Sequence, residues 1–246
     1  VTIEFDRIVL KPAEGERLEF PLDHLGPINV LDLQIGAREL LLDGVTVPAG
    51  RYQWIRLVVA DDAQSDPSIE FEDGSVFALK VPSGEQSGLK LNRGIVVPVN
   101  GDADFTVDIN LRRSIHERMS GLGTEYIMRP TMRLTQTDIT GSIAGSVDPA
   151  IASAADCDPA VYVYEGSGVT PDDLGSATEP VTSASVTLDE STGEYGYTAA
   201  YLMEGEYTAA LTCEAAADAP ETDDDIAFES AADVAVSPEQ TTSLNF

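Results

Sequence analysis

Acidic side chains gather most densely in the run Asp223-Asp224-Asp225, with Asp218 and Glu221 just before it. Carboxylate oxygens are hard ligands, and calcium takes six to eight such oxygens. Asp223, Asp224 and Asp225 are therefore a candidate calcium site. Their spacing lacks the alternating acids, central glycine and closing glutamate of an EF-hand, so a hydrated acidic loop stays open as the alternative.

The only two cysteines are Cys157 and Cys213, and each lies near a strand-like run. We predict that they form a disulfide, which implies an oxidising compartment. Closing this loop stabilises the fold by about 4 kcal/mol in the chain-entropy description. The alternative is a pair of buried free thiols in a cytosolic protein, and metal binding by two isolated cysteines is remote.

The residues of other reactive types form no catalytic motif. His24 and His116 are the only histidines, and neither belongs to a motif such as HExxH or GxSxG. We expect His24 in a loop and His116 on a short helix. With 43 Asp and Glu in the chain, no single acid pair stands out for glycoside chemistry. We therefore expect a protein that is not an enzyme and has no certain cofactor.

Two further segments are weaker candidates for binding. Asp61-Asp62 with Asp66 could hold a cation, although turn chemistry explains these acids better. The segment Pro82 to Gly88 could be a binding loop, although a long hairpin connection is the simpler interpretation.

Basic residues stop at Arg133: all 14 Lys and Arg lie at or before it, whereas residues 134–246 carry 22 of the 43 acids. A half-chain without cations cannot neutralise itself by ion pairs. Its carboxylates must be hydrated, screened or bound to cations, and they repel nucleic acids and anionic membranes. The basic residues Arg112-Arg113 and Arg129 with Arg133 are too few for a nucleic-acid patch, and we expect them to pair with nearby acids.

Strands must carry these residues, because alternation of apolar and polar side chains runs through the chain. It is clearest in residues 105–111, and the same pattern predicts strands over 51–59, 76–81 and 125–136, the last with Pro130 at an edge or bulge. A short helix is expected only from Arg112 to Met119. In the second half we predict strands at residues 141–147, 160–166, 180–188, 194–202, 205–213 and 233–238.

The fold class is therefore all-β, with two antiparallel β-sandwich-like domains and one short helix in the first. The loss of basic residues after Arg133 indicates a domain boundary nearby, and we expect the domains to cover residues 1–137 and 138–246. The longest apolar runs fall far short of the roughly 20 residues that a membrane helix needs. The first ten residues alternate like a strand and lack a signal-peptide pattern.

Several runs in the first half are similar to one family, the domain of unknown function 4382, and the resemblance covers nearly all of residues 1–135. These runs are LDLQIG (31–36), VPAGRYQWIRLVV (47–59), DGSVFALKVPSGEQSGLKL (73–91), FTVDINLRRSI (105–115) and YIMRPTMRL (126–134). The resemblance implies an exported bacterial protein, commonly a lipoprotein, and supplies no catalytic residues. Because members are commonly anchored through an N-terminal cysteine, the resemblance implies a lipid anchor upstream of Val1. Family members usually have a further strand ahead of the position of Val1, so either the ordered chain begins late or that strand comes from elsewhere.

The second half resembles the carboxypeptidase-regulatory or transthyretin-like sandwich through GSIAGSV (141–147) and LMEGEYTAAL (202–211). That resemblance implies an accessory stalk, spacer or adhesion module. We therefore expect an exported structural or adhesive protein of the bacterial surface that associates with itself or with other surface proteins. The relatively basic first domain could bind the acidic second domain of a neighbour and build a filament. The alternative is a calcium- or polysaccharide-binding surface lipoprotein without catalysis.

Overall fold

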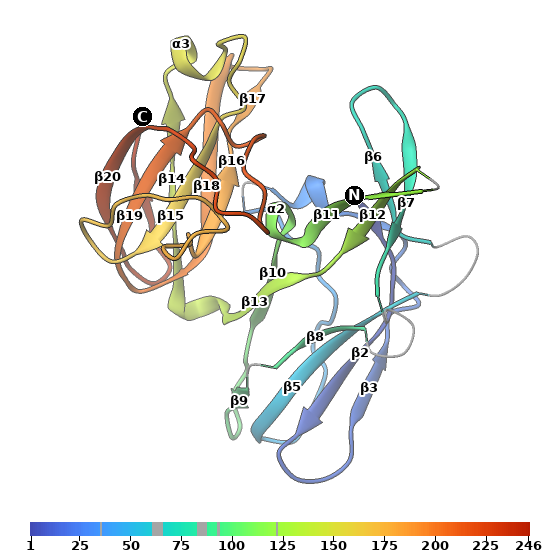
Figure 1. Ribbon diagram of the computed structural model, residues 1–246. Helices are drawn as coiled ribbons and strands as arrows, with labels where there is room; N and C mark the ends of the chain where they lie inside the picture. Colours follow the sequence, from blue (N-terminus) through green and yellow to red (C-terminus); the bar gives the residue numbers. More distant parts are fainter. Residues whose placement is uncertain (35, 61–65, 83–87, 93, 122) are drawn as a thin grey trace. The chain divides into compact units, whose positions relative to one another are not determined.

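Strands make up nearly all regular structure in the computed structural model, which describes residues 1–246 apart from 35, 61–65, 83–87, 93 and 122 (Figure 1). The prediction of an all-β fold is confirmed. The described helices are short: η1 (Val30–Leu33), α2 (Leu111–Ser114), η2 (Thr137–Ile139) and α3 (Pro149–Ala152). None of them has the length and apolar character needed to span a membrane. The chain divides into two compact units, Val1–Leu134 and Thr135–Phe246.

The first unit contains three sheets among its described residues. A six-stranded sheet has the order β11-β12-β7-β6-β1-β4, a second has the order β3-β2-β5-β8 with β9 beside β5, and β10 pairs with β13. Of the described pairings in this unit, β12 with β7 is parallel. The strands are β1 (Thr2–Ile3), β2 (Phe5–Pro12), β3 (Leu18–Pro21), β4 (Ile28–Asn29), β5 (Gly50–Val59), β6 (Ser68–Glu70), β7 (Val76–Lys80), β8 (Leu89–Leu91), β9 (Ile95–Val97), β10 (Phe105–Asn110), β11 (Ile115–Ser120), β12 (Gly123–Met128) and β13 (Thr131–Gln136).

The core of the first unit forms around the long antiparallel pair of β2 and β5. Ile55 lies opposite Leu10 and Leu57 lies opposite Ile8 in the register of this pair. All four side chains are buried in one apolar cluster, because residues two apart in a strand point to the same face of a sheet. The first unit therefore has a hydrophobic core of its own.

The helix expected from Arg112 to Met119 is wrong beyond its first turn. Asn110 caps α2 by accepting a hydrogen bond of 3.2 Å from the backbone N–H of Arg113, but the chain becomes strand β11 at Ile115. β11 pairs with β12 along its whole length, from Ile115 opposite Met128 to Ser120 opposite Gly123. A two-turn helix is marginal by itself, and pairing in a hairpin satisfies the same backbone groups within a sheet.

The strand expected over residues 125–136 is also divided in two. β12 ends at Met128, Arg129 and Pro130 form the break, and β13 starts at Thr131 in a different sheet. Proline lacks the N–H that a sheet ladder needs and disfavours continuation of the strand. Pro130 thus marks a change of sheet, which differs from the expected edge or bulge position.

The second unit contains two four-stranded sheets, β17-β18-β14-β21 and β16-β15-β19-β20 (Figure 1). All their described pairings are antiparallel except that of β14 with β21. The strands are β14 (Thr140–Val147), β15 (Ala160–Glu165), β16 (Thr182–Ser185), β17 (Thr187–Asp189), β18 (Glu194–Met203), β19 (Gly205–Thr212), β20 (Phe228–Val236) and β21 (Thr241–Ser243). The single strand expected over residues 180–188 is two strands, since the chain passes from one sheet to the other at Val186.

Strand β15 is buried on both of its faces. Val161 and Val163 pack between the two sheets together with residues such as Ile143 of the facing sheet. Tyr162 and Tyr164 point to the opposite face and belong to a second apolar cluster. The outer face of this sheet is therefore covered by other parts of the chain, and these parts contain the acidic residues described next.

Candidate metal centre

Two loops cover the outer face of the sheet that contains β15. Residues 166–181 join β15 to β16, and residues 213–227 join β19 to β20. Leu174 of the first loop and Ala215 of the second are buried with Tyr162 and Tyr164 in one cluster. Burial of these apolar side chains holds both loops against the sheet.

The hydroxyl groups of the two tyrosines contact aspartates of these loops. Tyr162 donates a hydrogen bond to Oδ2 of Asp218. Tyr164 donates to the backbone carbonyl of Asp172 and accepts from the backbone N–H of the same residue at 3.1 Å. Burial raises the pKa of Tyr164 well above its usual value, because loss of water disfavours the charged phenolate.

Asp173 is the most deeply buried acid of this region, with an exposed fraction of 0%. Its Oδ2 accepts hydrogen bonds from the backbone N–H of Asp224 at 2.7 Å and of Gly175 at 3.2 Å. Its Oδ1 is also buried but has no hydrogen-bond partner among the described residues. A buried carboxylate oxygen without a partner is costly, and this one requires an explanation.

Asp218 and Asp224 are half-buried beside it. Asp218 accepts a hydrogen bond from the backbone N–H of Leu174 at 3.2 Å. Burial raises the pKa of the Asp218 carboxyl, the negative charges of Asp173 and Asp224 add to the rise, and the hydrogen bonds from Tyr162 and Leu174 oppose it. Negative charge is therefore concentrated here at a cost in free energy.

Carboxylate oxygens of Asp173, Asp218 and Asp224 all lie within 4.8 Å of one another. Carboxylate oxygens of Asp172, Asp173 and Asp223 form a second group of the same size, which shares Asp173. Calcium binds oxygen at about 2.3–2.6 Å, so two oxygens of one coordination shell lie at most about 5 Å apart. The spacing of each group is within that limit.

The two loops approach each other closely at Gly175. A Cβ atom built on this glycine would lie 1.6 Å from the carbonyl oxygen of Thr222. Only glycine fits there without moving one of the two backbones. Thr222 in turn donates its hydroxyl proton to Oδ2 of Asp224 at 2.9 Å, so the contact at Gly175 also positions Asp224.

The acids predicted from the sequence only partly coincide with these groups. Asp223 and Asp224 each belong to one group, whereas Asp225 is exposed and belongs to neither. Asp218, which precedes the run Asp223-Asp224-Asp225 in the sequence, belongs to the same group as Asp224. No local pattern in the sequence selects Asp172 or Asp173, because they lie in a loop about 50 residues earlier. The binding of calcium by Asp223, Asp224 and Asp225 stays a prediction.

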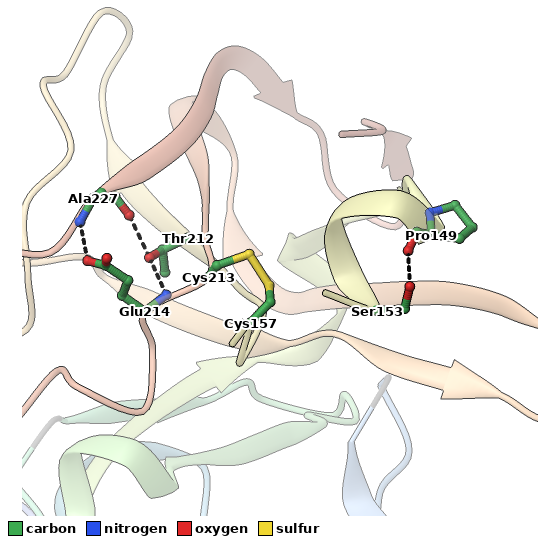
Figure 2. The surroundings of a disulfide bond; sticks show 7 residues. All are labelled: Pro149, Ser153, Cys157, Thr212, Cys213, Glu214 and Ala227. Carbon is green, nitrogen blue, oxygen red and sulfur yellow. Dashed lines mark hydrogen bonds between the residues drawn. A yellow bond between two sulfur atoms is a disulfide. The ribbon is translucent and has the colours of Figure 1, made fainter. Parts of the chain in front are cut away.

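A disulfide joins Cys157 and Cys213, whose Cα atoms are 4.4 Å apart (Figure 2). Cys213 directly follows β19 and opens the loop of residues 213–227. The backbone N–H of Asp158 donates to the carbonyl oxygen of Cys213 at 2.8 Å beside the disulfide. The predicted disulfide is thus present, and it ties the start of one acidic loop to the segment that precedes β15.

Hydrogen bonds close the base of the same loop (Figure 2). The Thr212 hydroxyl donates to the carbonyl oxygen of Ala227 at 2.7 Å, and the backbone N–H of Ala227 donates to Oε2 of Glu214 at 2.7 Å. Both ends of the loop are therefore fixed, and Asp218, Asp223 and Asp224 lie between them.

The remaining candidates lie apart from this cluster in the chain. His24 is exposed in a turn, as expected, while His116 lies on strand β11 and not on a helix. Arg133 forms the expected kind of ion pair, with Nη2 2.6 Å from Oδ2 of Asp108. Asp61 and Asp62, together with residues 83–87 of the candidate binding loop, fall outside the described residues.

Comparison with known proteins identifies the first unit. Residues 1–130 match the family described as Domain of unknown function (DUF4382). The chain belongs to this family. The match supports the resemblance stated for the first half of this DUF4382 protein, whereas the transthyretin-like assignment of the second half stays a prediction. No curated protein matches the sequence significantly.

Among solved structures, this DUF4382 protein is similar to GBS52, the minor pilin of the Gram-positive pathogen Streptococcus agalactiae. The identity is 15%, the TM-score is 0.23, and the alignment covers 83% of this chain and 84% of the pilin. It is also similar to a candidate cell adhesion protein of Bacteroides fragilis NCTC 9343, with 7% identity, a TM-score of 0.24, and coverage of 99% and 79%. TM-scores this low do not establish a shared fold.

Proposed function

We propose that the protein is an exported, non-catalytic component of the bacterial cell surface with a structural or adhesive role. The disulfide between Cys157 and Cys213 is the observation that carries the exported location. Disulfides persist in oxidising compartments and are rare in the reducing cytosol. The bond also closes a loop with a sequence separation of 56 residues, which stabilises the second unit by about 4 kcal/mol in the chain-entropy description.

The surface chemistry of the second unit supports the same function. All residues after Arg133 together contain 22 acids and no Lys, Arg or His. Such a surface repels nucleic acids and anionic membranes and keeps the unit hydrated. The proposal therefore places this unit outside the cell, where salt and divalent cations supply the counter-charge.

The proposed architecture is two domains, residues 1–137 and 138–246. Each compact unit has its own buried apolar cluster, centred on residues such as Leu57 in the first and Val161 in the second. The second domain would act as a transthyretin-like spacer. Attachment through a lipid anchor upstream of Val1, binding of polysaccharide and assembly into filaments remain predictions from the sequence.

Thiol labelling in intact bacteria tests the compartment directly. Cells that express the natural gene are treated with a membrane-permeant maleimide before lysis, and the protein is then isolated under denaturing conditions. Export predicts that Cys157 and Cys213 remain unlabelled until a reductant is added, and that external protease degrades the protein in intact cells. Labelling of both thiols without reductant, with protection from protease, would refute the proposal.

A further inference from the structure

We propose that Asp173, Asp218 and Asp224 bind one divalent cation of calcium size, with Asp172 and Asp223 at the margin of the same site. This ligand set differs from the consecutive run Asp223-Asp224-Asp225 that the sequence suggested. It joins two loops that are distant in the sequence. The site is independent of the proposed surface role, because binding can be measured on the purified protein.

The unpartnered oxygen of Asp173 points to a ligand. Asp173 has an exposed fraction of 0%, and its Oδ1 has no hydrogen-bond partner among the described residues. The other oxygen already accepts two backbone hydrogen bonds. A buried carboxylate oxygen is costly unless it is hydrogen-bonded, paired or bound to a metal, and a cation at Oδ1 would satisfy the oxygen that accepts no hydrogen bond from the described part of the chain.

No side chain of the same unit can supply the missing positive charge. Residues 135–246 contain no Lys, Arg or His. Two further carboxylates, Asp218 and Asp224, instead lie beside Asp173. Like charges at this separation destabilise one another, so the arrangement is one that a bound divalent cation would stabilise.

The carboxylates are held in place before any ion binds. Each carboxylate accepts a hydrogen bond from a backbone N–H group. Asp173 accepts from Asp224 at 2.7 Å, Asp218 from Leu174 at 3.2 Å and Asp224 from Ala219 at 2.8 Å. Glycine at position 175 lets the two loops meet. Fixed ligands reduce the entropy that binding would otherwise cost.

The donor set selects the class of metal. Every candidate ligand is a carboxylate oxygen, and both cysteines are consumed in the disulfide. Zinc and copper favour imidazole and thiolate ligands. Magnesium demands near-ideal octahedral geometry and retains several waters, whereas calcium accepts irregular sets of six to eight oxygens from protein and water. Calcium therefore fits this loop site best.

Calorimetry on the full chain tests the proposal. The protein is stripped with a chelator and titrated with calcium chloride in a background of sodium chloride, which screens diffuse attraction to the acidic surface. We expect one calcium ion per chain and a higher unfolding temperature with calcium than after chelation. Absence of both the heat and the temperature shift would overturn the proposal.

Matched variants locate the site. Asp173→Asn and Asp224→Asn should each weaken calcium binding at least roughly tenfold. Loss of a residue that only supports a metal ligand already weakens binding by about that factor. Asp225→Asn removes the same charge from the adjacent exposed position and should change affinity less than about twofold, since screened surface charges contribute little. Equal losses for D224N and D225N would show diffuse counterion attraction and refute a defined site.

A spectroscopic measurement keeps the test valid if D173N does not fold. Terbium takes the oxygen ligands of calcium, and its emission is sensitised by a nearby tyrosine. Tyr162 donates a hydrogen bond to Asp218, so excitation of tyrosine should produce terbium emission that calcium abolishes by competition. Asp218→Asn should lower this emission and Asp225→Asn should not. Emission that is equal in both variants would contradict the assignment.

Discussion

The backbone N–H of Asp224 donates a hydrogen bond of 2.7 Å to Oδ2 of the buried Asp173, which lies 51 residues earlier in the chain. This bond joins the loop of residues 166–181 to the loop of residues 213–227. It satisfies one oxygen of Asp173, while Oδ1 lacks a partner among the described residues. The loops thus enclose a buried carboxylate oxygen without a hydrogen-bond partner in the described part of the chain, and a bound calcium ion, as proposed, would supply a partner.

Gly175→Ala should separate the two loops. The new Cβ would lie 1.6 Å from the carbonyl oxygen of Thr222, and backbone atoms must move to relieve the clash. Overpacking of this kind costs about 1–3 kcal/mol. We expect such a loss in the free energy of unfolding, measured in urea, together with weaker calcium binding.

Gly196→Ala is the matched control in the same unit, since its Cβ would meet no atom closer than 3.7 Å. It should have little effect on calcium binding. A Gly175→Ala variant as stable as the wild type would show that the loops do not depend on this contact.

Reduction of the disulfide should destabilise the second unit. Cys157 and Cys213 close a loop with a sequence separation of 56 residues, and loss of a native disulfide of this kind typically costs about 2–5 kcal/mol. The double variant Cys157→Ser, Cys213→Ser should lower the free energy of unfolding by a similar amount and should be insensitive to reductant. An unchanged unfolding curve for the reduced wild-type protein would contradict this prediction.

Acidic pH should weaken the hydrogen bonds that the carboxylate of Asp233 accepts. Its carboxylate accepts hydrogen bonds from the backbone N–H of Gly168 at 2.8 Å, the Ser167 hydroxyl at 2.5 Å and the Thr208 hydroxyl at 2.8 Å. These bonds lower its pKa. Because the folded pKa lies below the unfolded value of about 3.9, the stabilisation is present above that pH and is lost as pH falls through the folded pKa.

The unfolding temperature measured from neutral to acidic pH should therefore fall less steeply below about pH 4 in Asp233→Asn than in the wild type. Glu229→Gln, an exposed position on the same strand β20, is the control and should follow the wild-type curve. Identical acid profiles for Asp233→Asn and the wild type would exclude this role of Asp233.

The sequence predicted several strands close to their observed bounds. β5 (Gly50–Val59) and β19 (Gly205–Thr212) lie where alternation and turn residues placed them. The helix predicted over residues 112–119 is wrong because local propensity favours a helix there. The pairing of β11 with β12 is a contact between two strands, and helix propensity takes no account of it.

The proposed ligand set could be predicted only in part from the sequence, for a similar reason. Three consecutive aspartates stand out in the sequence, but consecutive side chains do not all point in one direction, and Asp225 is exposed and belongs to neither group. Asp173 enters the cluster through contacts between two loops and through the space that Gly175 leaves. Such contacts depend on the folded chain and leave no local pattern.

Self-association should depend on salt if the chain assembles head to tail. All 14 Lys and Arg lie in residues 1–133, and residues 134–246 carry only acidic charges. Attraction between the first half of one molecule and the second half of another is strongest at low ionic strength and is largely screened at about 1 M salt, where the Debye length is about 3 Å. Sedimentation velocity across a salt series should show larger species at low salt. Monomers at every salt and protein concentration would rule out this mode of assembly.

A crystal structure grown with calcium, with anomalous data to identify the metal, tests the central claim most directly. We predict one calcium ion bonded to an oxygen of each of Asp173, Asp218 and Asp224, at about 2.3–2.6 Å. Oδ1 of Asp173 should be among these ligands. An ordered cluster without anomalous density, with Oδ1 of Asp173 hydrogen-bonded as a protonated acid, would contradict the account.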